Sequence, residues 1–478
     1  MTPSFSQSSE LSFSSSSQEN GSSSSPTPLD SSSSSMTTLI TSIEQQLSKL
    51  TIRRDDDYHD VERQQQEEEI IVELSQQQQV FSRFEGISPN VKWKAIYHEQ
   101  VLEEFPARYC PLEYLDEATP VSEDNSHLVP QRSQRWRELR QNRLTASNIS
   151  RALGFFNPKA SKKLKLSFSQ NAHEQTTREM YKSLLSREEL KTVFKMSEEE
   201  IEKLKNPIVN EESYDEIVKR VFTEWGSLHE LNCVSTLLES DLFDQDVTFC
   251  EAGFYVITEK KLSKVFTKQE LEEYQLSFEK IPPLGASPDG LLKKLNRTNG
   301  TKIHQVLENG KSDHPYSTEE EEDEFFSCVE IKCPTCFVPK YVKKGALIPS
   351  RPTFSYICKK PHDTIPVYYL TQMYTQMIAT NTRQCYFCSW TATKGCHVFK
   401  VEFDRKYALE MLYWLSKYYQ VVKYNGVDIA DDYFITSERY LKFLEWSLKI
   451  VNNIPVEKEI PKSRVYDGQD SERKNLFN

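Results

Sequence analysis

Apolar residues recur every three or four positions in several stretches of the chain, and short runs of consecutive apolar residues lie between these stretches. The first pattern is typical of a helix with one buried face, and the second of a buried strand. The helical pattern predicts helices over 215–240, 367–380, 404–424 and 436–452, and two shorter ones before Gly154, starting at Gln134 and near Thr145 or Ser147. The apolar runs predict strands over 249–257, 284–292, 327–332 and 384–391. We therefore expect a globular region between about 126 and 450.

The two ends of the chain have a different composition. Residues 1–35 contain 18 serines and few apolar groups, too little apolar surface to offset the entropy lost on ordering. A helical pattern over 37–52 is followed by acidic and Gln-rich runs, and aromatic residues become frequent from Val91. These changes predict a disordered leader over 1–90 with a short helix, an ordered lead-in over 91–125 and a polar tail over 453–478.

An acidic segment separates two of the predicted strands. About 30 residues lie between the strands near 290 and 328, and they include six consecutive acids, Glu319 to Glu324. Hairpin loops are usually 2–5 residues long, so this length predicts a disordered excursion from a tight hairpin. We expect a domain over 126–452 that is interrupted by an insertion at about 296–325.

The net charge of −12 is unevenly distributed along the chain. Residues 1–125 contain 8 Lys and Arg against 22 Asp and Glu, whereas residues 126–478 contain 51 against 49. Without the acidic residues 308–324, that second region has 50 basic and 41 acidic residues. The acidic average therefore does not exclude a nucleic-acid partner.

Membrane and secretory classes are not expected. No apolar run approaches the roughly 20 residues that span a bilayer, and the N-terminus has no basic and apolar regions typical of a secretory signal. The ten cysteines are too few for a disulfide scaffold, so we interpret them as thiols of a reducing compartment. These features predict a soluble, intracellular protein of the nucleus or cytoplasm.

The strand predicted over 327–332 carries the sharpest chemical signal. Residues two apart share a face of a strand, so Glu330 and Lys332 project together, and burying both is costly unless they have partners or a function. Upstream, Asp289 lies at a strand turn in the segment Gly285–Gly290. Two carboxylates and a lysine that converge are the usual chemistry of a metal-dependent phosphodiesterase. A surface ion pair is the alternative interpretation of Glu330 and Lys332.

Five sequence blocks, taken in order, resemble the lambda-exonuclease-like or YqaJ branch of the PD-(D/E)XK nuclease superfamily. The blocks are Trp136 to Arg140 with Leu144 to Ser147, Trp225 to Glu230, Ala286 to Leu291, Glu330 to Pro334, and Leu370 to Met373. They span about 130–405, a little over half of the chain. The resemblance implies an α/β fold with a restriction-endonuclease-like core (αβββαβ), in which a small mixed sheet is flanked by helices and the strands of the two acids are adjacent.

The resemblance also implies a role for each matching residue. Asp289 and Glu330 would bind Mg²⁺, for which Mn²⁺ can substitute, through their carboxylates, and Ile331 through its backbone carbonyl. Lys332 would orient the attacking water, and Glu230 would assist the metal or the water. Gln372 would support the lysine or the scissile strand; Gln376, one turn later, does not match the family. A solvated helix surface is the alternative interpretation of Glu230.

Two further residues match positions that hold the terminal 5′-phosphate of DNA in this branch. They are Arg140, whose guanidinium can pair with phosphate, and Ser147, which lies near a helix start. A surface cation and a helix N-cap are the alternatives. Lys162 and Lys163, in a basic cluster after this block, could line a DNA groove or a solvated surface.

The cysteines allow a metal-site interpretation that we do not favour. Cys333 and Cys336, with Cys385 and Cys388, have the spacing of a four-cysteine zinc site, and Cys396 adds a faint likeness to iron–sulfur relatives. However, Cys385 and Cys388 lie three apart in a predicted strand and would face opposite sides. We therefore expect neither zinc nor an iron–sulfur cluster.

These observations predict a metal-dependent deoxyribonuclease, acting as a 5′-to-3′ exonuclease on double-stranded ends in recombination or repair. The resemblance also implies a ring-shaped homotrimer and a single-strand annealing partner. Two alternatives stay open: an endonuclease or single-strand exonuclease of the same superfamily, and a non-catalytic DNA-binding protein on a nuclease fold.

Overall fold

The computed structural model describes residues 96–116, 118–166, 177–205, 214–294, 325–339, 354–425 and 435–461. All of them belong to one folded unit, Val80–Asn478. The predicted leader over 1–90 and, apart from Phe325, the predicted insertion at 296–325 lie outside the described residues, as does the chain after Pro461.

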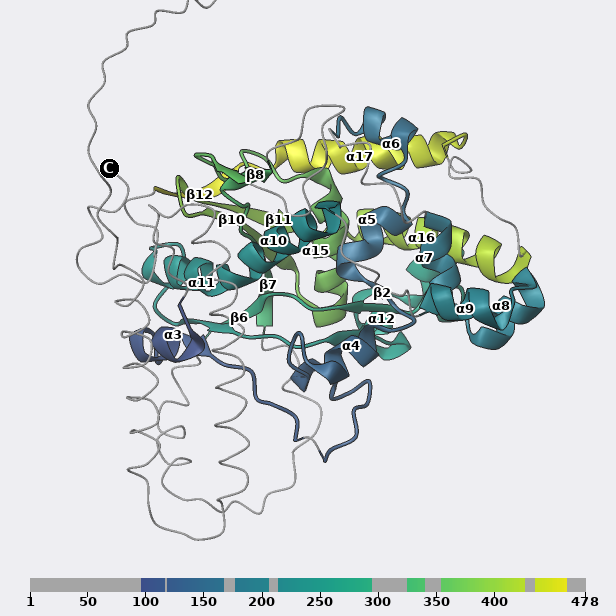
Figure 1. The fold of residues 1–478 in the computed structure, drawn as a ribbon, viewed down its shortest axis with the longest axis horizontal. Helices are drawn as coiled ribbons and strands as arrows, with labels where there is room; N and C mark the ends of the chain where they lie inside the picture. The colour runs from purple at the N-terminus through teal and green to yellow at the C-terminus, as the bar shows by residue number, and fades with distance from the viewer. Residues whose placement is uncertain are drawn as a thin grey trace, which may run out of the picture. The chain divides into compact units, whose positions relative to one another are not determined.

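A mixed seven-stranded sheet runs through this unit in the order β1-β3-β6-β7-β10-β11-β12 (Figure 1). Its strands are β1 (Tyr109–Cys110), β3 (Val247–Cys250), β6 (Gly290–Lys294), β7 (Phe325–Lys332), β10 (Gln384–Thr391), β11 (Gly395–Glu402) and β12 (Val456–Pro461). Strands β1 and β3 are parallel, as are β7 and β10, and the other neighbours are antiparallel. A parallel pair needs a crossover connection, and the one from β7 to β10 includes the helix α15 (Val367–Thr380).

Two smaller sheets and the remaining helices complete the described part. One sheet has the order β2 (Leu144–Thr145), β5 (Leu284–Ala286), β4 (Tyr255–Ile257), and the other pairs β8 (Phe337–Pro339) with β9 (Phe354–Tyr356). The helices are α3 (His98–Glu104), α4 (Gln134–Arg140), α5 (Ile149–Ala152), α6 (Pro158–Lys163), α7 (Thr177–Ser183), α8 (Arg187–Phe194), α9 (Glu198–Lys205), α10 (Tyr214–Leu228), α11 (Glu230–Glu239), α12 (Glu259–Val265), α13 (Lys268–Glu273), α16 (Arg405–Asn425) and α17 (Glu438–Asn453). Short 3₁₀ turns cover Ser126–Leu128, Ala146–Asn148 and Phe278–Lys280.

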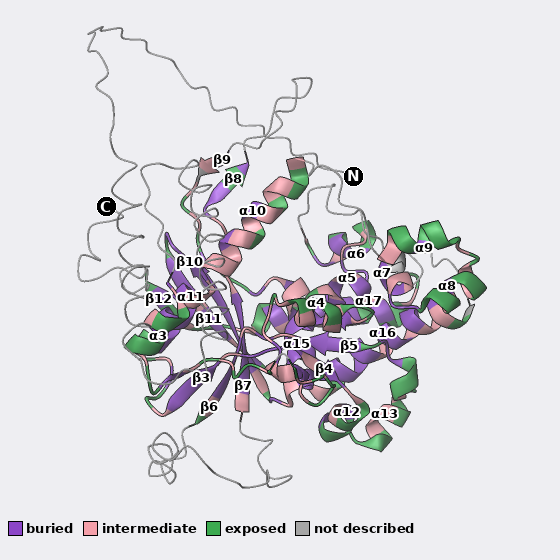
Figure 2. Ribbon diagram, turned by 60° about the horizontal axis from the view of Figure 1, so that its bottom comes forward, coloured by how far each residue is buried: buried purple, intermediate pink, exposed green. Residues whose placement is uncertain are grey.

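Helices cover both faces of the large sheet, so that its strands are largely buried (Figure 2). One apolar core contains α15, α16 and α17, and the other contains α10 and α11. Strand β10 contributes alternate residues to the two cores, with Phe387 in the first and Trp390 in the second. This two-residue period explains why a strand buried on both faces has a continuous apolar sequence. The chain is thus a mixed α/β protein, with a mixed sheet flanked by helices.

Five predicted elements are confirmed. The helix over 367–380 and the strand over 384–391 have the expected bounds, as α15 and β10. The strand β7 contains 327–332, and α16 and α17 match 404–424 and 436–452 to within two residues. Helix α15 ends before Asn381, which adopts the left-handed conformation (φ 54°). Asparagine is one of the residues that commonly take this conformation after a helix. The shorter pair from Gln134 is also present, as α4 and as a 3₁₀ turn that leads into α5.

The predicted single helix over 215–240 is wrong, because it is two helices that meet at His229. The His229 ring is buried between Trp225, 4.1 Å away, and Trp390, 5.3 Å away. Its Nδ1 contacts Asn232 Oδ1 at 3.2 Å. This buried packing holds His229 at φ −106°, ψ 6°, outside helical geometry, and makes Glu230 the first residue of α11.

Two predicted strands are each divided between two sheets. The run over 249–257 forms β3 and β4, and the run over 284–292 forms β5 and β6. The second break lies at Pro288, which has no backbone N–H to donate to a sheet. At the first break, a Cβ on Gly253 would collide with the backbone carbonyls of His127 and Val129. A local breaker thus marks the second break, whereas a tertiary contact at Gly253 accompanies the first.

The predicted polar tail over 453–478 is ordered in its first part. Residues Val456–Pro461 form β12, which pairs with β11 at the edge of the sheet. Its exposed and charged side chains are typical of an edge strand, which explains why the sequence had no apolar strand signal. Among the described residues, no helix is both long enough and apolar enough to cross a membrane.

Candidate functional site

The pairing of β6 with β7 places two of the predicted site acids next to each other. Asp289 directly precedes β6, and its backbone N–H donates to Val329 O at 3.0 Å. Its carboxylate Oδ2 accepts a 2.6 Å hydrogen bond from the Ile331 N–H. These two contacts, to the residues on either side of Glu330, hold Asp289 beside that acid. The expectation that the strands of the two acids are adjacent is confirmed.

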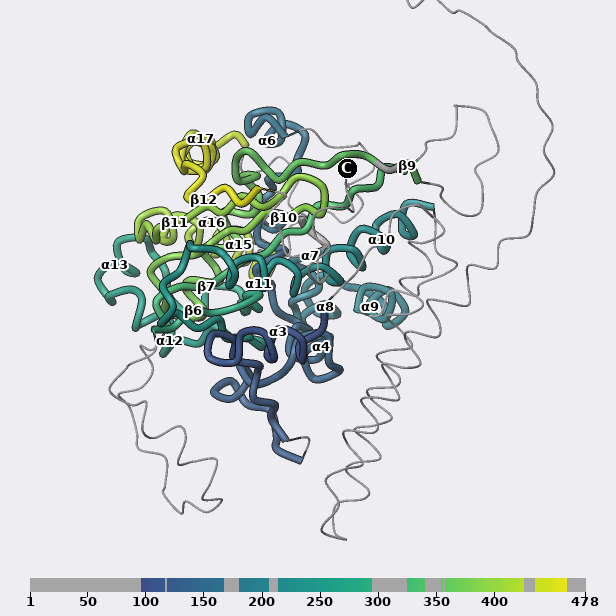
Figure 3. The backbone as a smooth tube through the Cα atoms, turned by 90° about the vertical axis from the view of Figure 1, so that its left-hand side faces the viewer, coloured from purple at the N-terminus to yellow at the C-terminus, as the bar shows by residue number. Residues whose placement is uncertain are grey.

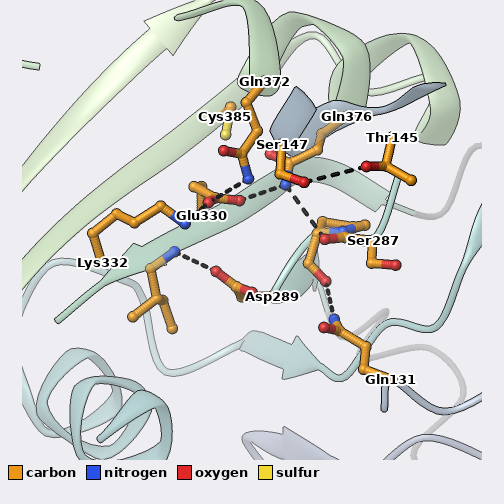
Figure 4. A network of polar contacts seen from close by, with 12 residues as sticks. Gln131, Thr145, Ser147, Ser287, Asp289, Glu330, Lys332, Gln372, Gln376 and Cys385 are labelled. Atoms are coloured by element: carbon orange, nitrogen blue, oxygen red, sulfur yellow. Dashed lines mark hydrogen bonds and ion pairs between the residues drawn. The ribbon is translucent and has the colours of Figure 1, made fainter. Parts of the chain in front are cut away.

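Glu330 is buried in β7, and both of its carboxylate oxygens have side-chain partners (Figure 4). Oε1 accepts hydrogen bonds from Lys332 Nζ and from Gln372 Nε2, the latter at 2.5 Å. Oε2 accepts a 2.5 Å hydrogen bond from Gln376 Nε2. The predicted common face of Glu330 and Lys332 is confirmed. Gln376 is a contact that the sequence reasoning passed over, although its spacing of four from Gln372 was a signal for a shared helix face.

Lys332 lies at the exposed end of this cluster. Its side chain is 27% exposed, and its Nζ lies 5.1 Å from the centre of the Tyr369 ring, near the start of α15. Burial alone would lower the pKa of Lys332, but the carboxylates of Glu330 and Asp289 outweigh burial and raise it. The lysine is therefore a cation held between two acids and an aromatic face.

Burial raises the pKa of Asp289 well above its ordinary value, and the nearby carboxylates of Glu330 and Glu230 raise it further. Lys332 acts in the opposite direction. When all three acids are ionised, Lys332 and the Arg132 partner of Glu230 leave one negative charge unbalanced. A bound cation would supply the missing positive charge.

Glu230 is also near this cluster, but it has a different partner. It is the first residue of α11, and its Oε2 accepts a 2.8 Å hydrogen bond from Arg132 Nη2. Burial raises the pKa of Glu230, whereas Arg132 and Lys332 lower it. Arg132 had no signal in the sequence, because its partner lies 98 positions away.

The segment before α4 is tied to the loop that carries Asp289. Gln131 Nε2 donates to Pro288 O at 2.9 Å, and Trp136 Nε1 donates to Ser287 Oγ at 2.8 Å. Ser133 directly precedes α4 as its N-cap, and its hydroxyl accepts a hydrogen bond from the Trp136 N–H. The first sequence block therefore contacts the third directly.

Arg140 and Ser147, the two predicted phosphate contacts, meet through Thr145. The Arg140 guanidinium lies over the Trp136 ring, 4.1 Å from its centre, and Nη2 is 3.4 Å from Thr145 Oγ1. Ser147 Oγ is 3.2 Å from the same oxygen, and Ser147 is exposed. No carboxylate of the described residues forms an ion pair with Arg140, and burial lowers the pKa of its guanidinium. This cation therefore has no protein counter-charge in the described part of the chain.

The two predicted DNA-binding lysines have different surroundings. Lys163 Nζ forms a 2.6 Å ion pair with Glu445 of α17, so that α6 and α17 lie side by side (Figures 1 and 3). Lys162 is exposed. Since Lys163 already has an acidic partner, Lys162 is the better placed of the two for a phosphate.

Cys385 lies apart from the other cysteines of the apparent zinc pattern, which pack in the core of α10 and α11. Cys385 packs in the core on the α15 side of the sheet, whereas Cys388 packs in the core of α10 and α11. The expectation that they face opposite sides of β10 is therefore confirmed. The ten cysteines of the chain are free thiols.

The candidate metal ligands of this site are oxygen atoms. As the described side chains lie, no three His, Cys, Asp or Glu residues form a group that could hold a metal ion. The expected ligands are two carboxylates, Asp289 and Glu330, with a backbone carbonyl at Ile331. Hard oxygen donors of this kind suit Mg²⁺, and the crowded acids described above fit a divalent cation.

Comparisons with known proteins give no family. No protein-family model matches the chain, and no curated protein matches it in sequence. Two solved structures of an alkaline exonuclease from Laribacter hongkongensis, LHK-Exo, are similar in structure, and one of them is a complex with dAMP. Each is 14% identical, covers 62% of this chain and 94% of its own, and has a TM-score of 0.29. Because that TM-score is low, the site's own geometry has to carry any functional conclusion.

Proposed function

We propose that this chain is a metal-dependent nuclease of the PD-(D/E)XK type, which hydrolyses DNA phosphodiester bonds. Its mode would be that of a 5′-to-3′ exonuclease on double-stranded ends, in recombination or repair. The observation that carries the proposal is the convergence of Asp289, Glu330 and Lys332 where β6 meets β7. A buried acid pair with an attached lysine is expensive for a purely structural role.

The order of elements around the site supports the same proposal. Helix α11 precedes the antiparallel strands β3, β6 and β7 of the large sheet, and α15 precedes β10, which is parallel to β7. Elements of the two smaller sheets and the helices α12 and α13 lie between these parts along the chain. With those additions set aside, the order is consistent with the αβββαβ core that the resemblance implies. Asp289 directly precedes β6 and Glu330 lies in β7, and the two glutamines that contact Glu330 lie on α15.

In this proposal, each side chain has a task at the scissile phosphate. Asp289, Glu330 and the Ile331 carbonyl would hold Mg²⁺, or Mn²⁺ in its place, which would supply positive charge to the phosphate oxygens and lower the pKa of water. Lys332 Nζ would donate hydrogen bonds to the attacking water or to a phosphate oxygen. Gln372 and Gln376 would fix the carboxylate of Glu330, and Glu230 would assist the water.

End recognition would come from the neighbouring Arg140 and Ser147. An arginine that has no carboxylate partner among the described residues, stacked on Trp136 and close to the hydroxyls of Thr145 and Ser147, is suited to a terminal phosphate. A homotrimer and a single-strand annealing partner belong to the same proposal. A mass measurement of the native protein and a pull-down with the candidate partner test them.

The deciding experiment uses the purified full chain with 5′-phosphorylated linear duplex and with circular duplex, with and without Mg²⁺. We expect Mg²⁺-dependent release of nucleotides from the linear duplex only. Cleavage of the circle would favour the endonuclease alternative, and preference for a single strand would favour the single-strand exonuclease. Lys332→Ala should keep the fold, checked by circular dichroism, and lose cleavage. Equal cleavage by Lys332→Ala and wild type would contradict the proposal.

A further inference from the structure

The ion pair between Arg132 and Glu230 neutralises an acid that the proposed reaction needs. Arg132 Nη2 lies 2.8 Å from Glu230 Oε2, and the two side chains are 56% and 34% exposed. An ion pair with this exposure contributes little to folding stability. The pair is therefore weak enough to be exchanged for another partner.

The backbone at Arg132 is in a conformation that side chains rarely adopt. Its φ is 70°, in the left-handed region, which is unfavourable for a residue with a Cβ. The neighbours hold this conformation, because Gln131 is bonded to Pro288 O and Ser133 caps α4. Strain that is held by its surroundings is found most often at functional positions.

The position of Arg132 also connects the two halves of the proposed site. Its segment begins α4, which carries Arg140, and touches the loop of Asp289 through Gln131. Its own side chain reaches Glu230. A guanidinium with about half of its side chain exposed, beside Glu230 and on the segment that leads into α4, is suited to pair with a phosphate of the DNA backbone.

We propose that Arg132 exchanges partners when DNA binds. In the DNA-free protein it pairs with Glu230, and in the complex it pairs with a backbone phosphate next to the scissile one. The exchange leaves Glu230 free to act at the metal or the water only when DNA is present. This inference rests on the proposed nuclease function, and it makes Arg132 a positioning residue for Glu230 as well as a DNA contact.

The test measures DNA affinity without divalent metal, so that cleavage does not enter. Fluorescence anisotropy with a labelled 5′-phosphorylated duplex is followed over a series of NaCl concentrations. For Arg132→Ala we expect the slope of log affinity against log salt to fall by about 0.9, the value for one phosphate contact, and affinity to fall roughly five- to tenfold at 0.1 M NaCl. Arg132→Lys should keep most of the slope.

Two control variants separate the side chain from its surroundings. Arg187→Ala removes an arginine of similar exposure that pairs with Glu198 and Glu202 on the neighbouring helix α9, and it should bind DNA as wild type does. Arg132→Gly removes the side chain but accepts the positive φ, so it should melt no lower than Arg132→Ala and bind DNA as weakly. Wild-type binding by Arg132→Gly would assign the effect to the backbone and overturn the inference.

A double-mutant cycle tests the exchange itself. Glu230→Gln should strengthen metal-free DNA binding, because Arg132 loses its resting partner, and in the Arg132→Ala background this gain should disappear. An equal gain in both backgrounds would overturn the inference, since it would reflect only the loss of a negative charge. If wild type cleaves DNA but Arg132→Ala binds as wild type does, the inference alone fails. If wild type neither binds nor cleaves DNA, the proposed function fails with it.

Discussion

Gln376 donates a 2.5 Å hydrogen bond to Oε2 of Glu330, one helical turn beyond Gln372, which donates to Oε1 at the same distance. One face of α15 therefore fixes both oxygens of the buried acid. The other amide atom of Gln376, Oε1, is buried without a partner among the described residues. Such an unpaired polar atom costs stability, so the bond to Glu330 is obtained at the expense of folding.

The variant Gln376→Leu should show how much this unpaired oxygen costs in folding stability and how much the bond to Glu330 contributes to cleavage. The variant removes the unpaired oxygen but also a donor to Glu330, so we expect its free energy of unfolding to change by no more than about 1–3 kcal/mol. Cleavage should fall by about 10- to 100-fold, as is typical when a group that orients a metal ligand is lost. Urea unfolding and initial rates on linear duplex measure the two effects.

Thr375→Val is the matched control for that change. Thr375 is buried on the same helix and bonds only to its own helix, through Thr371 O at 2.8 Å. The loss of this hydroxyl should leave the cleavage rate within about twofold of wild type, because the hydroxyl bonds to the backbone of its own helix and not to Glu330. An unimpaired rate in Gln376→Leu would show that Gln372 alone positions the acid.

Removal of the metal should stop cleavage without unfolding the protein. We expect EDTA to abolish nucleotide release, and excess Mg²⁺ or Mn²⁺ to restore it, because the oxygen ligands suit both hard cations. Asp289→Asn keeps the size of the side chain and should lose activity at every Mg²⁺ concentration. Its melting temperature should not fall, since burial and the nearby carboxylates disfavour the charged form of Asp289. Activity in EDTA would contradict metal dependence.

Arg140→Ala should remove the preference for a phosphorylated end. If Arg140 pairs with the terminal phosphate, wild type should degrade 5′-phosphorylated duplex faster than 5′-hydroxyl duplex, and the variant should degrade both at the slower rate. A lost charge-assisted hydrogen bond of about 1.5–3 kcal/mol corresponds to roughly 10- to 150-fold in the ratio of the two kcat/KM values. Arg137→Ala, an exposed change on the same helix, should keep the preference.

Lys261 should make stability depend on pH at alkaline values. Burial lowers the pKa of Lys261 to about 8, although Asp124 and Glu123 oppose the shift. Below pH 8 the lysine is protonated in both the folded and the unfolded protein, so the cost of burying its charge does not change with pH. Between pH 8 and 10.5 the unfolded state binds more protons, so the free energy of unfolding should rise with pH by an amount that cannot exceed about 3 kcal/mol.

Lys261→Met tests that assignment. Methionine keeps an unbranched apolar side chain and removes the charged Nζ, which lies 5.1 Å from the centre of the Tyr255 ring. The variant should be more stable than wild type at pH 7, and the difference should shrink as the pH rises from 8 to 10.5. Urea unfolding of both proteins over this range measures the difference, and a difference that stays constant with pH would contradict the lowered pKa.

The sequence predicts those parts of the structure in which the local hydrophobic pattern favours the same element that the packing of the folded chain requires. The α15 segment has no helix breaker between Val367 and Thr380, and the common face of Glu330 and Lys332 follows from the two-residue period of a strand. The division of 284–292 between two sheets depends on which strands lie beside it. The contact of Arg132 with Glu230 spans 98 positions and has no local signature. Gln376 had one, in its spacing from Gln372.

The two ends of the β6–β7 pair have different surroundings: the acids of the proposed site lie at one end, and the chain leaves and re-enters the sheet at the other. Asp289 lies at the start of β6, whereas Lys293 pairs with Phe325 near the other end, about 13 Å further along at the usual rise of a strand. The chain leaves and re-enters the sheet at that far end. Residues can therefore be added at that end without displacing the carboxylates of Asp289 and Glu330. The far end is therefore the natural place to graft a tag or a reporter domain onto this protein while leaving its chemistry intact.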